Sequence, residues 1–363
     1  MIVFLHLRVF KLKINFICTS GKSNFLDAGI GHLKRSLILA NELSSDDNKI
    51  NFFVYSGDSP LPKISEKINL EILKVKHHST FLDDKDVSIE PPCSDISFLD
   101  MSNPFFIKHS KKLIALIQKI KNNSGLTVII DGLGTESIIN SIPKKIPYDF
   151  LVAPYFGAEQ EFENIDQHLL GSEFFISEFN QAGYQHYKNI PKKAKKICIT
   201  CGGSDPKKIT LQILRSINKI IDLPELKVII GPNFSEDHVK EIEGTLSTFS
   251  SIFTLVIAPS CIQNYIDWSD IVIATSGLTK YEILKSGVPS IIIPFDASQF
   301  ATNKASAKKN AFLTISAEKI KYDLGPMLKT LINDNLKRKD LSDRAFSLLD
   351  DKGASRIISR IKK

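Results

Sequence analysis

The chain is poor in cysteine, and this scarcity excludes one class of protein at the outset. It has five cysteines in 363 residues, which is typical of reduced thiols in a cytosol and not of a disulfide framework. Cys198 and Cys201 have the spacing of a redox or metal pair, but the run from Ile197 to Thr200 is apolar and the sequence holds no second pair. We therefore interpret both as buried strand thiols.

Other motifs are missing as well. The sequence has no aromatic and basic motif of the kind that binds nucleic acid. Residues 1–13 are apolar with interspersed basic residues, yet the segment is too short to span a bilayer and lacks a small-residue cleavage site. We interpret it as an extension before the first strand, with a leader strand or an interfacial anchor as alternatives, and expect a cytoplasmic protein.

Composition is otherwise that of an ordinary soluble protein, with 43% hydrophobic and 24% charged residues. The length suits two domains. The net charge of +7 comes mostly from lysines in scattered pairs. A positive charge of this kind favours binding of an anionic substrate or a membrane surface. Alternatively, the lysines only cover a solvent-exposed face.

One stretch organises the chain, namely residues 29–40. It follows an apolar, strand-like run at 14–18 and leads into apolar positions with helical spacing over 33–43. Gly29 and Gly31 let the backbone approach a ligand closely, and the free N–H groups at a helix start favour a phosphate or an oxyanion. His32 stands where the turn becomes helix, so it is a candidate general base; alternatively it is a cap or a surface group.

The first half alternates between strand-like and helix-like segments. Further strands are predicted at 50–55, 70–75, 126–132 and 150–154, and a helix at 106–120. The polar, proline-containing stretch 83–104 is predicted to be a loop. Asp131 ends a buried strand, where open α/β sheets bind ligands; it either touches substrate or caps the following turn.

A change in composition over 155–195 marks the predicted domain boundary. After it the alternation restarts, with strands at 197–200, 226–230, 253–258, 271–274 and 290–294, and a last helical stretch at 334–361. Alternating strands and helices predict two doubly wound α/β domains whose parallel sheets face a central cleft. The predicted domains are 14–190 and 191–335, followed by a C-terminal helix at 336–363.

Two glycine turns of the second half each follow a strand and precede a helix. Gly203 and Ser204 in the first turn offer N–H groups and a hydroxyl to a phosphate. Ser276 and Gly277 in the second turn offer the same. Neither turn matches the Gly-x-x-x-x-Gly-Lys-Ser/Thr phosphate loop, and the first glycine turn of the chain is not a regular dinucleotide fingerprint. Glu282 has capping-box spacing from Thr279, or it binds a ribose diol.

Together, Gly-Ile-Gly-His-Leu-Lys-Arg (29–35), Cys-Gly-Gly-Ser-Asp-Pro (201–206) and Thr-Ser-Gly-Leu-Thr-Lys-Tyr-Glu with a later Gln (275–299) resemble the GT-B superfamily of UDP-sugar enzymes. Within it the chain is most similar to the UDP-2,4-diacetamido-2,4,6-trideoxy-β-L-altropyranose hydrolases of pseudaminic acid biosynthesis. That family is related to the N-acetylglucosaminyltransferase that completes lipid II. The resemblance spans about residues 14–315.

The resemblance implies a role for each matching residue. His32 is the catalytic base, in a motif that includes Gly29, Gly31 and Arg35. The second half supplies the nucleotide site: Gly203, Ser204, Ser276, Gly277 and Leu278 bind the diphosphate, Glu282 the ribose and Gln299 the nucleotide-sugar. Asp131 is added as a substrate-binding residue because of its position at a strand end, not from the resemblance. The resemblance implies no metal and no other cofactor.

Two departures from the family pattern concern the sugar pocket. Family members commonly carry Arg-x-Asp soon after the first strand, where this chain has 19-Thr-Ser-Gly-Lys-Ser-Asn-24, and some place a tyrosine just after the strand that ends in aspartate. The resemblance implies hydrolysis of a UDP-sugar, with UDP release. A glycosyltransferase of the same fold, which would contact a membrane, and a UDP-sugar-binding module without turnover are the alternatives.

Overall fold

The computed structural model describes residues 11–22, 27–29, 31–44, 48–56, 68–74, 92–177 and 190–362. The chain divides into two compact units. Unit 1 consists of residues 1–178 and 352–363, and unit 2 of residues 179–351. The boundary thus falls earlier than the predicted position 190, and the last twelve residues belong to the first unit. Residues 1–10 lie outside the described part.

Unit 1 contains seven parallel strands in the order β4-β3-β1-β5-β6-β7-β8, and the short β2 pairs antiparallel with the end of β1. The strands are β1 (Lys13–Lys22), β2 (Asp27–Gly29), β3 (Lys49–Ser56), β4 (Asn69–Lys74), β5 (Ser94–Asp100), β6 (Ser124–Ile130), β7 (Phe150–Ala153) and β8 (His168–Leu170). Its helices are α1 (Gly31–Ser44), α2 (Pro104–Lys108), α3 (Ser110–Asn123), α4 (Ile138–Ser141), α5 (Ala158–Glu161) and α13 (Gly353–Ile361).

Alternating side chains of β1 build a core on each face of this sheet. Ile14 and Phe16 point toward α1 and α13, and Ile17 points toward α3; all three are fully buried. The Phe16 ring stacks between Phe52 and Phe98, with centroids 4.8 and 4.7 Å away. Both faces are covered, so the central strands are buried, including polar side chains such as Asn15, Asn51 and Ser97.

The prediction of a loop over 83–104 is wrong in its second part, because β5 lies there and pairs with both β1 and β6. Two prolines precede the strand and do not interrupt it, and Ile96 and Phe98 alternate with smaller side chains. The helix predicted at 106–120 is divided into α2 and α3 at His109. In the region predicted to be irregular, β8 forms the outer edge of the sheet.

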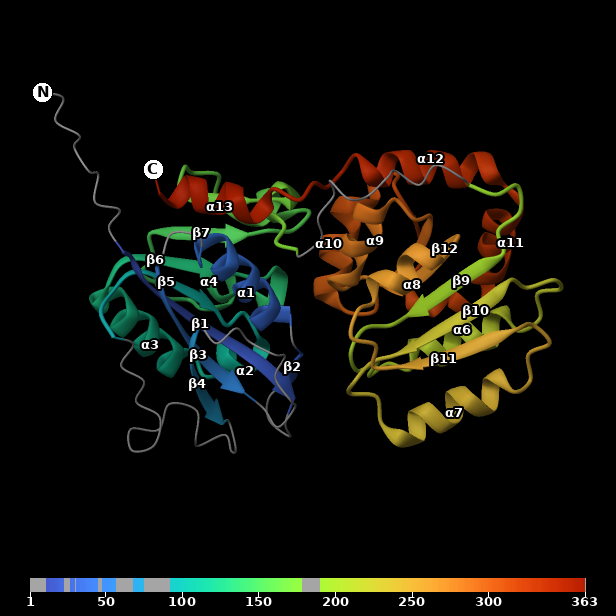
Figure 1. Cartoon of the computed structure of the whole chain (residues 1–363), viewed down its shortest axis with the longest axis horizontal. Coiled ribbons are helices and arrows are strands. Elements are labelled where there is room, and N and C mark those ends of the chain that lie inside the picture. The colour runs from blue at the N-terminus through green and yellow to red at the C-terminus, as the bar shows by residue number, and fades with distance from the viewer. Residues whose placement is uncertain are drawn as a thin grey trace, which may run out of the picture. The chain divides into compact units, whose positions relative to one another are not determined.

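Unit 2 is a six-stranded parallel sheet in the order β11-β10-β9-β12-β13-β14. The strands are β9 (Lys196–Thr200), β10 (Glu225–Ile230), β11 (Phe253–Ile257), β12 (Ile271–Thr275), β13 (Ser290–Ile293) and β14 (Leu313–Thr314). The helices are α6 (Ile209–Ile217), α7 (Glu236–Leu246), α8 (Gln263–Trp268), α9 (Thr279–Ser286), α10 (Ala297–Ala307), α11 (Gly325–Asn333) and α12 (Asn335–Phe346). Figure 1 shows these elements. The predicted fold, two doubly wound α/β units with parallel sheets, is confirmed.

Cys198, in the middle of β9, and Cys201, just after it, are buried free thiols, as predicted. Burial raises the pKa of Cys198 to about 12 and that of Cys201 well above its usual value. Both therefore stay protonated and unreactive at neutral pH.

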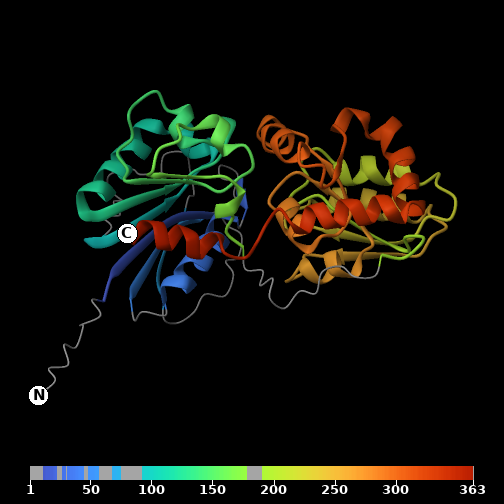
Figure 2. The same cartoon turned by 90° about the horizontal axis from the view of Figure 1, so that it is seen from above.

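Helix α13, the last of the chain, packs on unit 1, as Figures 1 and 2 show. Ala354, Ile357 and Ile361 join the same core as Phe16, and the Arg356 guanidinium donates to the Glu173 carbonyl at 2.7 Å. The approach is close at Gly353, where a Cβ atom would lie 2.0 Å from the Phe175 carbonyl oxygen. Only glycine fits there without a shift of the helix.

Replacing Gly353 with alanine should therefore lower the free energy of unfolding by about 1–3 kcal/mol, the usual cost of overpacking. Urea denaturation measures this. Gly244→Ala in α7 is the matched control, because no atom lies within 4 Å of the new methyl group. That control should be neutral or stabilising by up to about 1 kcal/mol. Equal midpoints for the two variants would contradict the packing assigned to α13.

Candidate active site

The strand order of unit 1 reverses between β1 and β5. From β1 the chain proceeds through β3 to β4 on one side, and then from β5 to β8 on the other. Ligands of open α/β sheets bind at such a switch point, beyond the carboxyl ends of the strands. His32 is the second residue of α1, which follows β1 and β2, and Asp100 ends β5. These two side chains therefore flank the switch point from neighbouring strands.

His32 and Asp100 are in direct contact. The His32 Nδ1 atom lies 2.6 Å from Asp100 Oδ1, and the two side chains are 14% and 1% exposed. Arg35 binds both carboxylate oxygens of Asp100 through its Nε and Nη2 atoms, and its Nη1 atom donates to the Tyr155 hydroxyl. Tyr155 follows β7. The ends of β5 and β7 and the beginning of α1 thus form one buried hydrogen-bonded network.

The charges in this network keep Asp100 ionised. Burial alone raises the pKa of the carboxyl group, but the adjacent Arg35 and His32 outweigh burial and hold the pKa below its usual value. Burial opposes the charge of Arg35 as well, and the Asp100 carboxylate more than restores it, so the pKa of Arg35 rises. Burial likewise raises the pKa of Tyr155, which remains a neutral hydroxyl.

The ionised carboxylate decides how His32 binds its proton. Arg35 Nη2 also lies 2.9 Å from His32 Nδ1, but a guanidinium can only donate and a carboxylate can only accept. The shorter contact is with the carboxylate, so we infer that Nδ1 carries the proton and donates to Asp100. The Nε2 atom then holds a lone pair, as a general base requires.

Arg35 itself must be corrected as a substrate ligand. Its side chain is buried, and its guanidinium is committed to Asp100 and Tyr155. The guanidinium links Asp100 to Tyr155 inside the network, so these contacts occupy it in place of a substrate phosphate. Of the two glycines, Gly31 starts α1 and Gly29 ends β2, while Ile30 between them lies outside the described residues.

For Asp131, predicted either to contact the substrate or to cap the following turn, the structure shows the capping contacts. Its carboxylate is fully buried and accepts from the backbone N–H groups of Gly132, Ile138 and Ile139 and from the Ser137 hydroxyl, at 2.7–3.0 Å. These bonds hold the turn that begins α4. The capping alternative therefore describes this residue.

In unit 2 the strand order reverses between β9 and β12, which are hydrogen-bonded neighbours. Both predicted glycine turns lie there, since residues 201–206 follow β9 and residues 276–278 follow β12. Gly202 has a φ of +78°, in the left-handed region that favours glycine. Gly203 is exposed, and a Cβ atom added there would have no neighbouring atom within 4 Å. The first turn passes so closely over Gly231 that a Cβ atom there would lie 2.3 Å from the Gly202 carbonyl oxygen.

Asp205 fixes this first turn to the beginning of α6. Its buried carboxylate accepts from the N–H groups of Ile209 and Thr210 at 2.7 and 2.9 Å, and His238 Nε2 lies 3.1 Å away. Asp205 therefore caps α6 while Gly203 and the half-buried Ser204 stay at the surface. The aspartate fixes the turn, and the two residues before it present polar groups.

The second turn is held by α10. Gln299 Oε1 accepts from the Ser276 N–H at 3.2 Å, and the Ser276 hydroxyl donates to Asn303 Oδ1 at 3.0 Å. The structure thus brings two predicted ligands together, although Ser276 is buried and both of its donors are occupied in this state. Gly277 is half-buried, and the Leu278 side chain is 40% exposed.

Glu282 lies in the first turn of α9, half-buried. The capping box expected between Thr279 and Glu282 is wrong, because the helix begins one residue earlier: Leu278 is its N-cap and makes no side-chain capping bond. A carboxylate in the first turn is still favoured by the helix dipole.

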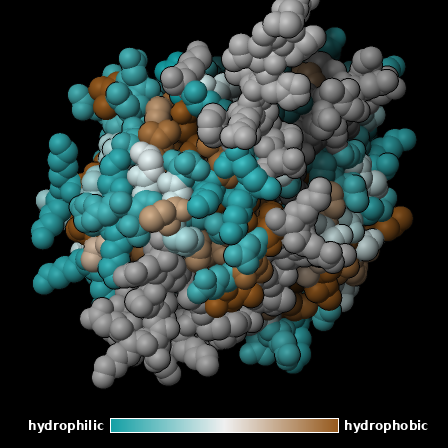
Figure 3. All heavy atoms as spheres, turned by 60° about the vertical axis from the view of Figure 1, so that its left-hand side comes forward, coloured by the Kyte–Doolittle hydropathy of each residue, from teal (hydrophilic) through white to brown (hydrophobic). Residues whose placement is uncertain are grey.

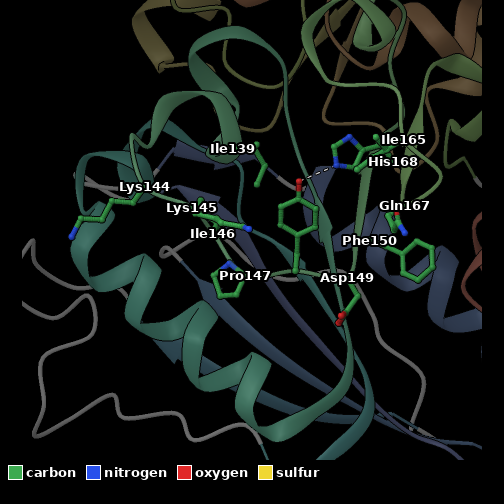
Figure 4. Close-up of a pocket in the computed structure, with 11 residues that line it drawn as sticks. Ile139, Lys144, Lys145, Ile146, Pro147, Asp149, Phe150, Ile165, Gln167 and His168 are labelled. Atoms are coloured by element: carbon green, nitrogen blue, oxygen red, sulfur yellow. Dashed lines mark hydrogen bonds between the residues drawn. The ribbon is translucent and has the colours of Figure 1, made fainter.

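A separate hollow of about 740 Å³ lies on unit 1, lined by residues of β7, β8 and the segment before β7. Figure 4 shows Lys144 and Pro147 at the left of this group of residues, and Phe150, Gln167 and His168 at the right. His168 Nδ1 lies 2.6 Å from the Glu163 carbonyl oxygen, so Nε2 accepts from the Tyr148 hydroxyl, 2.9 Å away. None of the predicted site residues lines this hollow. Figure 3 shows one face of the molecule, on which apolar surface lies in separate patches between hydrophilic side chains.

Comparison with known proteins places these two units in a wider class. The glycosyltransferase family 28 C-terminal domain matches residues 196–360. A putative UDP-N-acetylglucosamine 2-epimerase from Listeria monocytogenes has a similar structure, with a TM-score of 0.65, 15% sequence identity, and coverage of 97% of this chain and 96% of that one. The chain thus has the GT-B fold.

Two curated relatives align in sequence. Protein MJ1062 of Methanocaldococcus jannaschii is 26% identical over 284 residues, which is 74% of this chain; the chain spans only about half of that relative, 53% of its length. The spore coat polysaccharide biosynthesis protein SpsG of Bacillus subtilis is 21% identical over 251 residues, 67% of this chain and 71% of that protein.

The capping role of Asp131 predicts a distinct pH dependence of stability. Burial, opposed by the four donors, raises the pKa of this carboxyl from 3.8 to about 6. Between these values the folded protein binds a proton that the unfolded chain has lost, so stability falls as the pH rises. The stability advantage of wild type over Asp131→Asn should therefore shrink by about 3 kcal/mol between pH 4 and pH 7. Urea unfolding of both proteins across this range measures it, and a constant difference would contradict the assignment.

Proposed function

We propose that this chain hydrolyses a UDP-linked acetamido-deoxy sugar at its anomeric carbon, releasing UDP and the free sugar for nonulosonic acid synthesis of the pseudaminic type. The observation that carries the proposal is the contact between His32 Nδ1 and the ionised Asp100. It leaves Nε2 as a base at the switch point of unit 1. A protein that only bound the nucleotide would have no need of such an oriented base.

In the proposed reaction, His32 Nε2 removes a proton from water while the water oxygen bonds to the anomeric carbon. The bond from that carbon to the UDP oxygen breaks, and its electron pair leaves with the diphosphate. Asp100 stabilises the imidazolium that forms, as the carboxylate does in a catalytic triad. Backbone N–H groups of the turns at 202–204 and 276–278 stabilise the departing charge.

The remaining roles fall to unit 2. Gly203, Ser204, Ser276, Gly277 and Leu278 lie at the switch point between β9 and β12, which supports their assignment to the diphosphate. Glu282 is assigned to the ribose and Gln299 to the nucleotide-sugar. Gln299 holds the Ser276 N–H, so ligand entry would have to exchange this bond for one to phosphate.

The relatives support a UDP-sugar substrate. SpsG is described as a polysaccharide biosynthesis protein, and the similar Listeria structure as a putative UDP-N-acetylglucosamine 2-epimerase. The family match over residues 196–360 is to a glycosyltransferase domain, and it favours a second candidate. In a transferase the same His32 would remove the proton of an acceptor alcohol in place of water.

The deciding experiment measures UDP release from a panel of UDP-N-acetylated sugars without any acceptor. Wild type should release UDP and free sugar in equal amounts, and His32→Ala should lose about a hundred- to ten-thousand-fold in turnover while binding UDP unchanged. UDP binding without release would instead favour a transferase that lacks its acceptor, or a binding module. Unchanged turnover in His32→Ala would remove this histidine from the mechanism.

Asp100→Asn tests whether the carboxylate acts through His32. An asparagine can present its amide to Nδ1 and disfavour the productive tautomer, so turnover should fall by at least about a hundred-fold with UDP binding retained. The informative control is the double variant with His32→Ala, whose turnover should equal that of His32→Ala alone. A further loss in the double variant would show that Asp100 acts independently of the histidine.

A further inference from the structure

The most exposed large apolar side chains among the described residues all belong to one edge of unit 2. Ile221, Ile252 and Leu336 are 87%, 73% and 74% exposed. Ile221 lies in the turn before β10, Ile252 immediately precedes β11, and Leu336 is in the first turn of α12. Single exposed apolar residues are normal on a protein surface, but three aliphatic tips at one edge require an explanation.

Parallel strands bring these turns together, because β9, β10 and β11 all begin at the same edge (Figure 1). The Leu226 N–H donates to the Ile252 carbonyl at 2.9 Å. Ile221 lines a hollow of about 270 Å³ together with Lys193 and Lys329. We call this surface the amino edge; it comprises the turns before β9, β10 and β11 and the junction of α11 with α12.

The first turn of α12 is tied to the same place. The buried Arg338 guanidinium, two residues after Leu336, donates to the Ile332 carbonyl at 2.9 Å and also to the Pro191 carbonyl. The Ala194 N–H bonds to the Ile332 carbonyl at 2.9 Å. The segment before β9 and the start of α12 are therefore fixed side by side.

Lysines surround the apolar tips. Exposed lysines of the amino edge are Lys192, Lys193, Lys195, Lys219, Lys329 and Lys337. Nearby carboxylates are fewer, and most are engaged. Asp270 accepts from the N–H groups of Lys195 and Lys196 at 2.7 and 3.0 Å, Asp334 caps α12, and Asp222 lies 3.7 Å from Lys193 Nζ.

We infer that the amino edge of unit 2 docks on an anionic phospholipid surface. The isoleucine and leucine tips enter the headgroup layer, and the lysines face lipid phosphates. Protein interfaces are depleted in lysine, so the mixture of exposed aliphatic tips and lysines fits a bilayer better than a protein partner. None of the helices in the described part of the chain is long and apolar enough to cross a bilayer.

Docking in this way leaves the carboxyl ends of β9 and β12 open. The turns at 202–204 and 276–278 lie at the opposite edge of the same parallel sheet. The inference does not depend on the proposed function, since it concerns a different surface.

Co-sedimentation of the full chain with vesicles tests the inference. The protein should bind vesicles of equal phosphatidylglycerol and phosphatidylcholine, bind pure phosphatidylcholine far less, and release as salt increases. Lys192→Glu with Lys195→Glu should lower the partition coefficient by at least about fivefold for each lysine removed. Changing Ile221, Ile252 and Leu336 together to serine should also weaken binding.

Two matched controls distinguish this edge from general surface properties. Ile257→Ser alters a side chain that is 65% exposed at the carboxyl end of β11, and Lys240→Glu reverses an exposed charge on α7. Both should bind as wild type does. The inference is overturned if the chain ignores anionic vesicles, if the controls lose as much binding as the edge variants, or if the serine changes abolish self-association in lipid-free solution and leave vesicle binding intact.

Discussion

The buried ion pair of Arg35 with Asp100 is the interaction on which the candidate site depends. A carboxylate without exposure would ordinarily take up a proton, and it would then donate where His32 needs an acceptor. The guanidinium prevents this by binding both oxygens, while its Nη1 atom donates to the Tyr155 hydroxyl. One cation thus sets the charge of an acid, the tautomer of a histidine and the position of a loop after β7. The arrangement is possible only because α1 and β5 meet at the switch point of the sheet.

The same design principle recurs with the opposite outcome at Asp131 and Asp205. Each is a buried aspartate after a central strand, and each is surrounded by backbone N–H donors at the beginning of a helix. Such donors bind an oxygen without introducing a cation, so these aspartates fix a turn; Asp205 also contacts a histidine, His238, but that side chain is buried. In unit 2 the buried Asp205 holds the turn, and Gly203 and Ser204 lie at its surface. The position of an acid at a strand end is therefore not enough to assign its role; its partners decide.

The glycine turns and both sheets could be predicted, because glycine pairs after apolar runs and the alternation of strands with helices are local signals. Asp100 was missed because the local composition around it favours a loop: β5 is short, follows two prolines and alternates small polar with apolar side chains. The strand forms through long-range pairing with β1 and β6, which local sequence does not reveal. Arg35 was misassigned since a charged residue beside a glycine turn indicates a phosphate ligand until burial is known. The apolar stripe of α13 predicts that the helix is buried, but not on which unit.

The return of α13 to unit 1 affects the order in which the protein can be made. Unit 2 is one uninterrupted stretch of chain, whereas unit 1 lacks the helix α13 until residues 352–363 have left the ribosome. During synthesis the later unit therefore has all its residues first. The earlier unit, whose Phe16 core includes Ile357 and Ile361, must wait for the segment after unit 2 with part of its apolar surface uncovered. Residues 352–363 thus set the moment at which the unit bearing His32 can complete its core.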